Sequence, residues 1–108
     1  MRRSWHCKAQ QLVDLLVAYD IADTQGSGAK RLRAVHDLCC GYGTRVQFSV
    51  FECRLTPARY ATLTSELEAI IDTTRDCVHI YHFGRPLPEC KTVLGTPSRR
   101  DVGDTWIL

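Results

Sequence analysis

The sequence has no apolar run that reaches the ~18 residues a helix needs to cross a bilayer. Its opening stretch, Met1–Gln11, contains basic residues but no apolar central segment of the kind that defines a secretory signal peptide. The sequence also contains no internal repeat and no low-complexity segment. These absences argue against a membrane protein and a repeat array, and we expect a globular protein of the cytoplasm.

Cysteine is present but lacks the spacing of a metal or redox motif. No two of the six cysteines are arranged as Cys-x-x-Cys, so neither a zinc ribbon nor a thiol redox site is indicated. Cys39 and Cys40 lie in a helical pattern, whereas Cys53 and Cys77 lie in strand patterns among apolar neighbours. A buried cysteine acts as a small hydrophobic residue. We therefore expect reduced, buried thiols rather than a disulfide scaffold.

The size and the charge of the chain are those of one ordinary domain. A chain of 108 residues is too short for two hydrophobic cores, and 44% hydrophobic with 24% charged residues is typical of globular proteins. The net charge of +2 permits a nucleic-acid partner but does not indicate one, because dedicated nucleic-acid binders are usually more basic.

The first third of the chain predicts a strand and a helix. The apolar run Leu12–Tyr19, which ends at Asp20, has the length of a buried strand. After a loop rich in Gly, Ser and Asp, apolar residues at helical spacing predict a helix over Lys30–Cys40. Ser27 is the expected N-cap of this helix and Gly41 its expected C-terminal stop.

The middle of the chain predicts two strands and a second helix. Thr44–Leu55 is rich in β-branched and aromatic residues and fits two short antiparallel strands, or one strand broken by a tight turn near Phe48–Ser49. Thr56 can cap the helix that follows, and Pro57 suits its first position. The apolar stripe of that helix consists of Tyr60, Leu63, Leu67, Ile70 and Ile71.

A last strand is predicted over Cys77–Phe83, and the whole order is strand, helix, strand, strand, helix, strand. This is the order of the ferredoxin-like α+β fold, in which helices cover one face of the sheet. Because Cys77–Phe83 has apolar or aromatic residues on both faces, we expect a homodimer that packs sheet against sheet. We expect a further short strand at Lys91–Leu94, and the apolar tail Trp106–Leu108 can add a strand to the partner's edge.

Asp20 is the first candidate for chemistry because it ends the first predicted strand, directly after Tyr19. A carboxylate at a strand end projects from a rigid support. Mg²⁺ binds few carboxylates, keeps several waters and makes a bound water a better nucleophile toward phosphate. From spacing alone, the more common role of such a residue is that of a loop-entry Asp that caps or solvates the turn. One carboxylate per chain is few for a metal, and a dimer that brings two copies of Asp20 together would supply a second.

Basic residues gather at the start of the first predicted helix. Lys30, Arg31 and Arg33 occupy its first turns, where the helix dipole disfavours cations. With Arg45 beyond the helix, they either form a patch that contacts phosphates without sequence specificity or face solvent.

The histidines do not share the spacing of metal ligands. His79 and His82 point to opposite faces if Cys77–Phe83 is a strand, and His36 lies among ordinary helical neighbours. We therefore assign structural or surface roles to all three.

One segment is specific enough to suggest a family. Tyr42–Cys53 contains Tyr-Gly-Thr-Arg-Val-Gln-Phe-Ser-Val-Phe-Glu and is close to a Tyr-Gly-x-Arg-Val-Gln-x-Ser-Val-Phe-Glu stretch of the CRISPR-associated Cas-two endonuclease family. The strand end Tyr19-Asp20, the basic segment Lys30–Arg33 and the segment Ile80–Gly84 also resemble that family. With the similar tail that ends at Leu108, the resemblance covers roughly residues 13–108.

The resemblance implies a function and a site. It implies a ferredoxin-like homodimer whose two Tyr19-Asp20 strand ends face each other across a cleft. It implies that Asp20 is the catalytic residue, binds Mg²⁺ or Mn²⁺ and supports hydrolysis of phosphodiester bonds in RNA or double-stranded DNA. From it we expect Tyr19, Arg31, Arg33 and Arg45 to contact the nucleic acid. It also implies a complex with the Cas-one integrase that inserts new spacers.

The resemblance also concerns the start of the chain. Family chains usually begin with Met where this sequence has Val13. A GTG codon, which encodes Val within a gene, can initiate translation. We therefore expect Met1–Leu12 to be an extension that is not native or is disordered, and residues 13–108 to form a single nuclease domain. N-terminal mass determination of the native protein tests this, and a mass that includes Met1–Leu12 would contradict it.

Two hypotheses follow. In the first, the protein is a metal-dependent endonuclease that uses Asp20. In the second, it is a non-catalytic adaptor dimer that binds duplex DNA between integrase subunits. A ferredoxin-like RNA-binding module is a weaker third class, because the predicted strands lack the aromatic signature that stacks bases.

Overall fold

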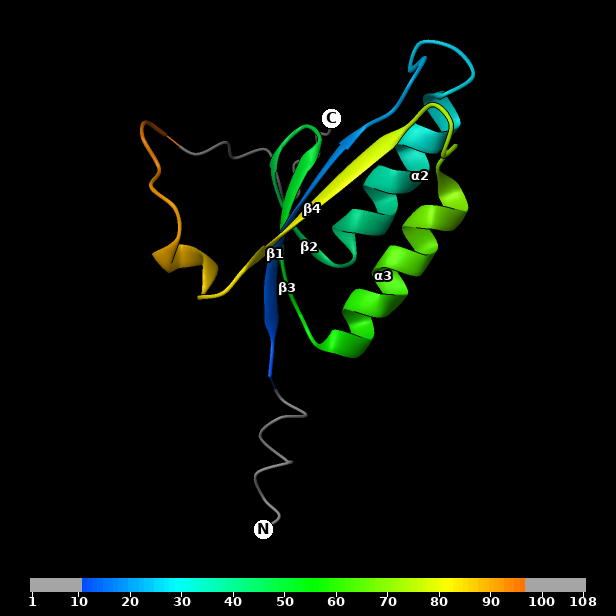
Figure 1. The fold of residues 1–108 in the computed structure, drawn as a ribbon. Coiled ribbons are helices and arrows are strands. Elements are labelled where there is room, and N and C mark those ends of the chain that lie inside the picture. Colours follow the sequence, from blue (N-terminus) through cyan, green and yellow to red (C-terminus); the bar gives the residue numbers. More distant parts are fainter. Residues whose placement is uncertain (1–10, 97–108) are drawn as a thin grey trace.

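Within residues 11–96, which the computed structural model describes, the chain forms a four-stranded sheet and two α-helices (Figure 1). The predicted small α+β fold is confirmed, and the elements follow in the predicted order. They are β1 (Val13–Asp20), α2 (Ala29–Cys40), β2 (Gly43–Gln47), β3 (Val50–Leu55), α3 (Pro57–Ile70), β4 (Cys77–Phe83) and the short 3₁₀ helix η1 (Leu87–Glu89).

The strands are arranged in the order β2-β3-β1-β4, and every neighbouring pair is antiparallel. β1 therefore lies in the interior of the sheet between β3 and β4, and β4 forms one edge. Both α-helices cover the same face of the sheet (Figure 1). We call the opposite face, which these helices leave uncovered, the open face.

The hydrophobic core lies between the sheet and the two helices because the residues of each strand alternate between the two faces. Leu15 and Val17 of β1 and Phe51 of β3 are completely buried on the helix side. Each fully buried side chain of this kind stabilises the fold by about 1.5–3 kcal/mol relative to exposure. The helices contribute the buried residues Val35, Cys39, Leu63 and Leu67.

Helix α2 begins differently from the prediction. Its N-cap is Gly28, which makes no side-chain cap, and not Ser27. The Ser27 hydroxyl and backbone N–H instead donate to the carboxylate of Asp23, each at 2.9 Å. Gly28 is required because a Cβ at this position would lie 1.8 Å from the carbonyl oxygen of Ala22. The expected stop at Gly41 is confirmed.

Helix α3 begins as predicted. The Thr56 side chain accepts a hydrogen bond of 3.2 Å from the backbone N–H of Arg59, and Pro57 occupies the first helical position. Proline fits there because its missing N–H would have no partner within the helix. Of the predicted apolar stripe, Leu63 and Leu67 are buried and the other members pack at the margin of the core.

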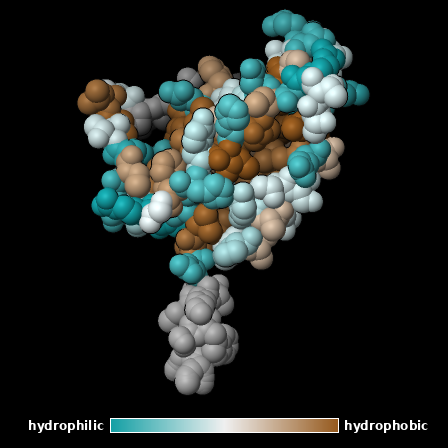
Figure 2. Space-filling model, in the orientation of Figure 1, coloured by the Kyte–Doolittle hydropathy of each residue, from teal (hydrophilic) through white to brown (hydrophobic). Residues whose placement is uncertain are grey.

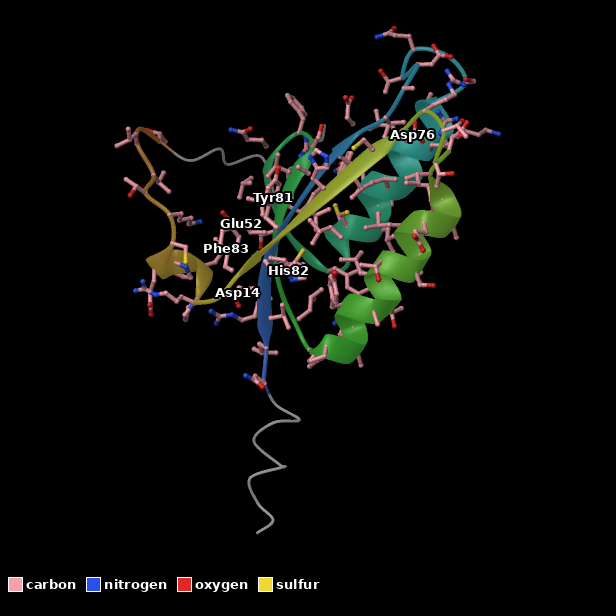
Figure 3. The ribbon with its side chains drawn as sticks, viewed as in Figure 1. Asp14, Glu52, Asp76, Tyr81, His82 and Phe83 are labelled. Atoms are coloured by element: carbon pink, nitrogen blue, oxygen red, sulfur yellow. The ribbon has the colours of Figure 1, made fainter. Side chains whose placement is uncertain are left out.

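The open face mixes apolar and polar side chains. The register of β1 with β4 places Tyr81 beside Leu16, and that of β1 with β3 places Glu52 on the other side of Leu16. Figure 3 shows Glu52, Tyr81 and Phe83 directed away from the helices, whereas His82 is directed toward them. β4 thus has apolar residues on both faces, as predicted, and Tyr81 is 53% exposed.

The segment after β4 is held against the sheet by two side-chain contacts. The Asp14 carboxylate accepts hydrogen bonds from Arg54, at 2.9 and 3.1 Å, and from the backbone N–H of Leu87 at 2.6 Å. Figure 3 shows Asp14 near the turn between β4 and η1. Lys91 reaches Glu52 at 2.9 Å. The predicted strand at Lys91–Leu94 is wrong, because the segment is bound through side chains and forms no backbone ladder.

The predictions for the chain ends lie mainly outside residues 11–96. They concern the Met1–Leu12 extension and the Trp106–Leu108 strand, and they stay predictions. The predicted burial of the thiols is confirmed for Cys39 and Cys53 but is wrong for Cys40 and Cys77, which are exposed. None of the helices in the described part of the chain is long and apolar enough to span a membrane.

Candidate functional site

Asp20 ends the central strand β1 and is exposed to solvent. It lies opposite Cys77, the first residue of β4. Five of the six aspartates within residues 11–96 have hydrogen-bond or ion-pair partners, whereas the side chain of Asp20 has none in that range. A solvent-facing carboxylate on a rigid strand end is available to bind a ligand.

Tyr19 fixes the strand end that presents Asp20. The residue is 6% exposed, and its ring stacks at 6.3 Å from the ring of Phe51. Its hydroxyl donates a hydrogen bond of 3.3 Å to the carbonyl oxygen of Phe48, and its backbone N–H donates to Ser49 at 3.1 Å. Burial raises the pKa of the Tyr19 hydroxyl far above its ordinary value, so the group stays a neutral donor. The structure therefore gives Tyr19 a positioning role in the core.

The Asp20 carboxylate can supply half of a Mg²⁺ site. Within residues 11–96, no group of three His, Cys, Asp or Glu side chains is arranged to hold a metal ion. Mg²⁺ is usually bound by one or two carboxylates, with waters in its other positions. Asp20 can supply one such carboxylate, and a second copy of the chain can supply another.

Arg31 forms an ion pair with Asp76 within the chain. Its Nε donates to Asp76 at 2.7 Å and its Nη2 donates to the other carboxylate oxygen at 3.2 Å. Backbone N–H groups of Ala22 and Asp72 donate to the same carboxylate at 2.9 and 2.8 Å. These four donors, with the guanidinium as the strongest, hold the pKa of the Asp76 carboxyl well below its usual range. Arg31 thereby ties the segment after Asp20 to the start of β4.

Arg33 and Arg45 face a groove between α2 and the turn that joins β2 to β3. The groove has a volume of about 640 Å³, and Tyr19, His36 and Phe48 also line it. The side chain of Arg33 is 80% exposed and pairs with Asp37 at 3.8 Å. The Arg45 guanidinium lies 5.0 Å above the Phe48 ring and 3.2 Å from the His36 ring. The groove thus joins two cations to an exposed aromatic ring, a combination suited to a nucleic-acid backbone and its bases.

The structure brings together only part of the residue set proposed from the sequence. Tyr19, Arg33 and Arg45 line the same groove, whereas Asp20 and Arg31 do not. Sequence reasoning missed Asp76, because no spacing pattern relates it to Arg31, 45 positions away. A hint was available in the unfavourable position of a cation in the first turn of α2, which suggests an anion nearby.

The comparisons with known proteins agree with this fold. The sequence model of the family described as CRISPR associated protein Cas2 matches residues 13–86. The chain therefore belongs to the CRISPR-associated Cas2 family, and the resemblance noted in the sequence is confirmed.

Individual relatives extend the agreement. The chain is 41% identical over 94 residues to the CRISPR-associated endonuclease Cas2 of Halalkalibacterium halodurans, a match that covers 87% of this chain and 98% of the relative. It is also 40% identical over 70 residues to the CRISPR-associated endoribonuclease Cas2 of Nitratidesulfovibrio vulgaris. This match covers 65% of this chain and 69% of the relative. The crystal structure of Streptococcus pyogenes Cas2 at pH 6.5 superposes with a TM-score of 0.68 at 41% identity, over 76% of this chain and 99% of that one.

Proposed function

We propose that the chain is a Mg²⁺- or Mn²⁺-dependent endonuclease that hydrolyses phosphodiester bonds in DNA or RNA during spacer acquisition. The observation that carries the proposal is Asp20, the one aspartate of residues 11–96 without a protein partner, at the exposed end of the central strand. The names of the relatives, endoribonuclease and endonuclease, support the same chemistry.

The active form is a ferredoxin-like homodimer that brings two copies of Asp20 together. A dimer is supported because Asp20 is the one partner-free aspartate within residues 11–96, where no complete set of metal ligands is present. It is also supported by the apolar part of the open face, where the half-exposed Tyr81 lies beside Leu16. Burial of this patch against a second sheet would favour association.

In this dimer, different residues of the chain bind the metal ion, position the strand end and bind phosphates. When bound, the metal ion supplies an activated water and neutralises charge that develops on the phosphate. Asp20 holds the ion at the end of β1, and the hydrogen bond from Tyr19 to Phe48 keeps that strand end in place. Arg33 and Arg45 bind phosphates along the groove, so they supply affinity and not sequence preference.

The test is Asp20→Asn with duplex DNA and with single-stranded RNA in Mg²⁺. Asparagine keeps the shape of the side chain but removes the charge that binds the metal. We expect cleavage to fall at least about 100-fold on whichever substrate the wild type cuts. Asp23→Asn is the matched control, because Asp23 is a nearby aspartate that is already used by Ser27. Full activity of Asp20→Asn would defeat the assignment.

A second candidate is a non-catalytic adaptor that spans duplex DNA within a complex with the Cas-one integrase. The specific observation in its favour is the groove, which offers Arg33 and Arg45 for phosphates without needing a metal. In this case Asp20→Asn leaves spacer acquisition intact, whereas Arg33→Glu with Arg45→Glu abolishes duplex binding. Unchanged duplex affinity in the charge-reversed protein would count against the adaptor.

A further inference from the structure

Cys77 and His79 form a close pair of side chains on the open face, and both are of types that can bind a metal ion. They are two residues apart on β4, so they project to the same side of the sheet. The Cys77 Sγ lies 3.3 Å from His79 Nε2, and both residues are exposed. The cysteines lack a zinc-finger spacing, so no sequence motif connects a thiol with this histidine.

The register of the sheet adds a third donor to this pair. Asp20 of β1 lies directly opposite Cys77, and Ala18 lies opposite His79. Asp20, Cys77 and His79 therefore share one face at one end of two adjacent strands. As placed, they do not form a three-ligand cluster, in agreement with the lack of such clusters within residues 11–96. Rotation of the Asp20 side chain toward Cys77 would complete the set, and it breaks no contact with another described residue.

The distance between sulfur and nitrogen suits a tetrahedral ion. Zinc binds thiolate sulfur at about 2.3 Å and imidazole nitrogen at about 2.05 Å, so two such ligands at a tetrahedral angle lie about 3.6 Å apart. The observed 3.3 Å is close to this separation and is also compatible with a simple hydrogen bond from the thiol to the imidazole. Small rotations of the two side chains are enough to admit an ion between them.

A second Cys–His pair in the described chain is a natural comparison. Cys40 Sγ lies 3.7 Å from His36 Nε2 and 3.9 Å from His36 Nδ1 on helix α2. Both His36 nitrogens have other neighbours, with Arg45 at 3.2 Å from Nε2 and Asp37 at 3.4 Å from Nδ1. Although Cys40 is exposed, partial desolvation of its sulfur raises the pKa of the thiol, which disfavours the thiolate that a metal requires. This pair is therefore the weaker candidate and a suitable internal control.

We propose that Cys77, His79 and Asp20 bind one divalent transition-metal ion per chain, with Zn²⁺ as the best-matched ion and a water in the fourth position. Thiolate and imidazole are ligands that Zn²⁺ prefers and Mg²⁺ avoids, so this site is chemically distinct from a site made of carboxylates alone. On binding, the sulfur–hydrogen bond of Cys77 is replaced by a sulfur–metal bond, and the proton passes to solvent. The inference does not require nuclease activity, although it shares Asp20 with the proposed function.

The test is titration of the full, metal-free, reduced chain with Co²⁺, without nucleic acid. Cobalt takes zinc sites and gives a near-ultraviolet charge-transfer band only when a thiolate binds it, while its visible bands report tetrahedral geometry. We expect one Co²⁺ per chain with both features, followed by their loss when Zn²⁺ is added. Cys77→Ser should abolish the charge-transfer band, although five other cysteines remain in the chain. His79→Gln and Asp20→Asn should each weaken binding by about tenfold or more.

Cys40→Ser is the matched control and should leave the band and the affinity unchanged. Lack of a thiolate band in the wild type would overturn the proposal. So would a band that persists in Cys77→Ser or disappears in Cys40→Ser, because the ion would then be held by other thiols. These readouts are independent of cleavage, so a failure of the metal site and a failure of the proposed endonuclease are distinguished.

Discussion

The guanidinium of Arg31 donates two hydrogen bonds to the carboxylate of Asp76, which lies 45 residues further along the chain. Asp76 has a completely buried side chain, and Arg31 is 19% exposed at its side chain. Bidentate pairs of this kind are among the stronger polar contacts in proteins. This contact joins the start of α2 to the residue that precedes β4. The same Asp76 carboxylate accepts a hydrogen bond from the backbone N–H of Ala22, two residues after Asp20.

We predict that Asp76→Asn lowers the melting temperature by at least about 5 °C, because it removes the partner of a guanidinium and weakens two backbone hydrogen bonds. The measurement is thermal unfolding followed by circular dichroism at neutral pH. Asp37→Asn is the control, because its ion pair with Arg33 is exposed on both sides and such pairs contribute little. Equal melting temperatures for Asp76→Asn and the wild type would show that the Arg31 contact does not stabilise the fold.

The same contact predicts how stability depends on pH. The Arg31 guanidinium lowers the pKa of Asp76, and the Arg54 guanidinium lowers the pKa of Asp14. A carboxylate whose pKa is lower in the folded state stabilises the fold above its unfolded pKa, about 3.9, and loses this effect as the pH falls toward the folded pKa. Wild-type stability should therefore decline below about pH 4.

The diagnostic quantity is the difference in melting temperature between the wild type and Asp76→Asn. This difference should be constant above about pH 5 and should shrink as the medium becomes more acidic, since asparagine does not titrate. Asp14→Asn should behave in the same way at the other end of the sheet. A difference that widens on acidification would mean that the folded-state pKa of Asp76 is raised and not lowered.

The groove beside α2 predicts the salt dependence of nucleic-acid binding. Each phosphate contact releases condensed counterions, so Arg33→Gln and Arg45→Gln should each reduce the slope of log affinity against log salt by about one. Fluorescence anisotropy with a labelled duplex over a range of NaCl concentrations measures this slope. Arg59→Gln is the control. Arg59 is on α3, where its guanidinium lies over the Tyr42 ring, and it is not part of the groove. Identical slopes in all four proteins would remove the groove from the binding surface.

Most of the fold was predictable because local patterns determine it. The run that ends at Asp20 has the length of a strand, and Thr56 with Pro57 marks the start of α3 by capping chemistry. The start of α2 was mispredicted, because the choice between Ser27 and Gly28 depends on the nearby carbonyl of Ala22, which a local pattern does not include.

Of the residues of the candidate site, only Asp20 could be singled out from the sequence by its position. Asp20 stands out by its place at the end of an apolar run. The pairing of Arg31 with Asp76 depends on how α2 packs beside the segment before β4, and the position of Asp20 opposite Cys77 depends on how β1 pairs with β4. Arg31 and Arg33 look equivalent in the sequence, yet the first is tied to the core and the second faces solvent. Long-range contacts of this kind follow from how the helices and strands assemble, which a single sequence does not reveal.

The position of β4 at the edge of the sheet has a consequence for how the protein behaves at high concentration. Its seven residues include no Lys, Asp, Glu or Pro, the residues with which proteins usually protect an edge strand. Figure 2 shows hydrophobic residues gathered along β4 and beside the helices. An edge of this composition is a template for a further strand, whether that strand comes from an orderly assembly or from an aggregate. A charged residue placed in β4 should therefore improve solubility at the expense of any assembly that uses this edge.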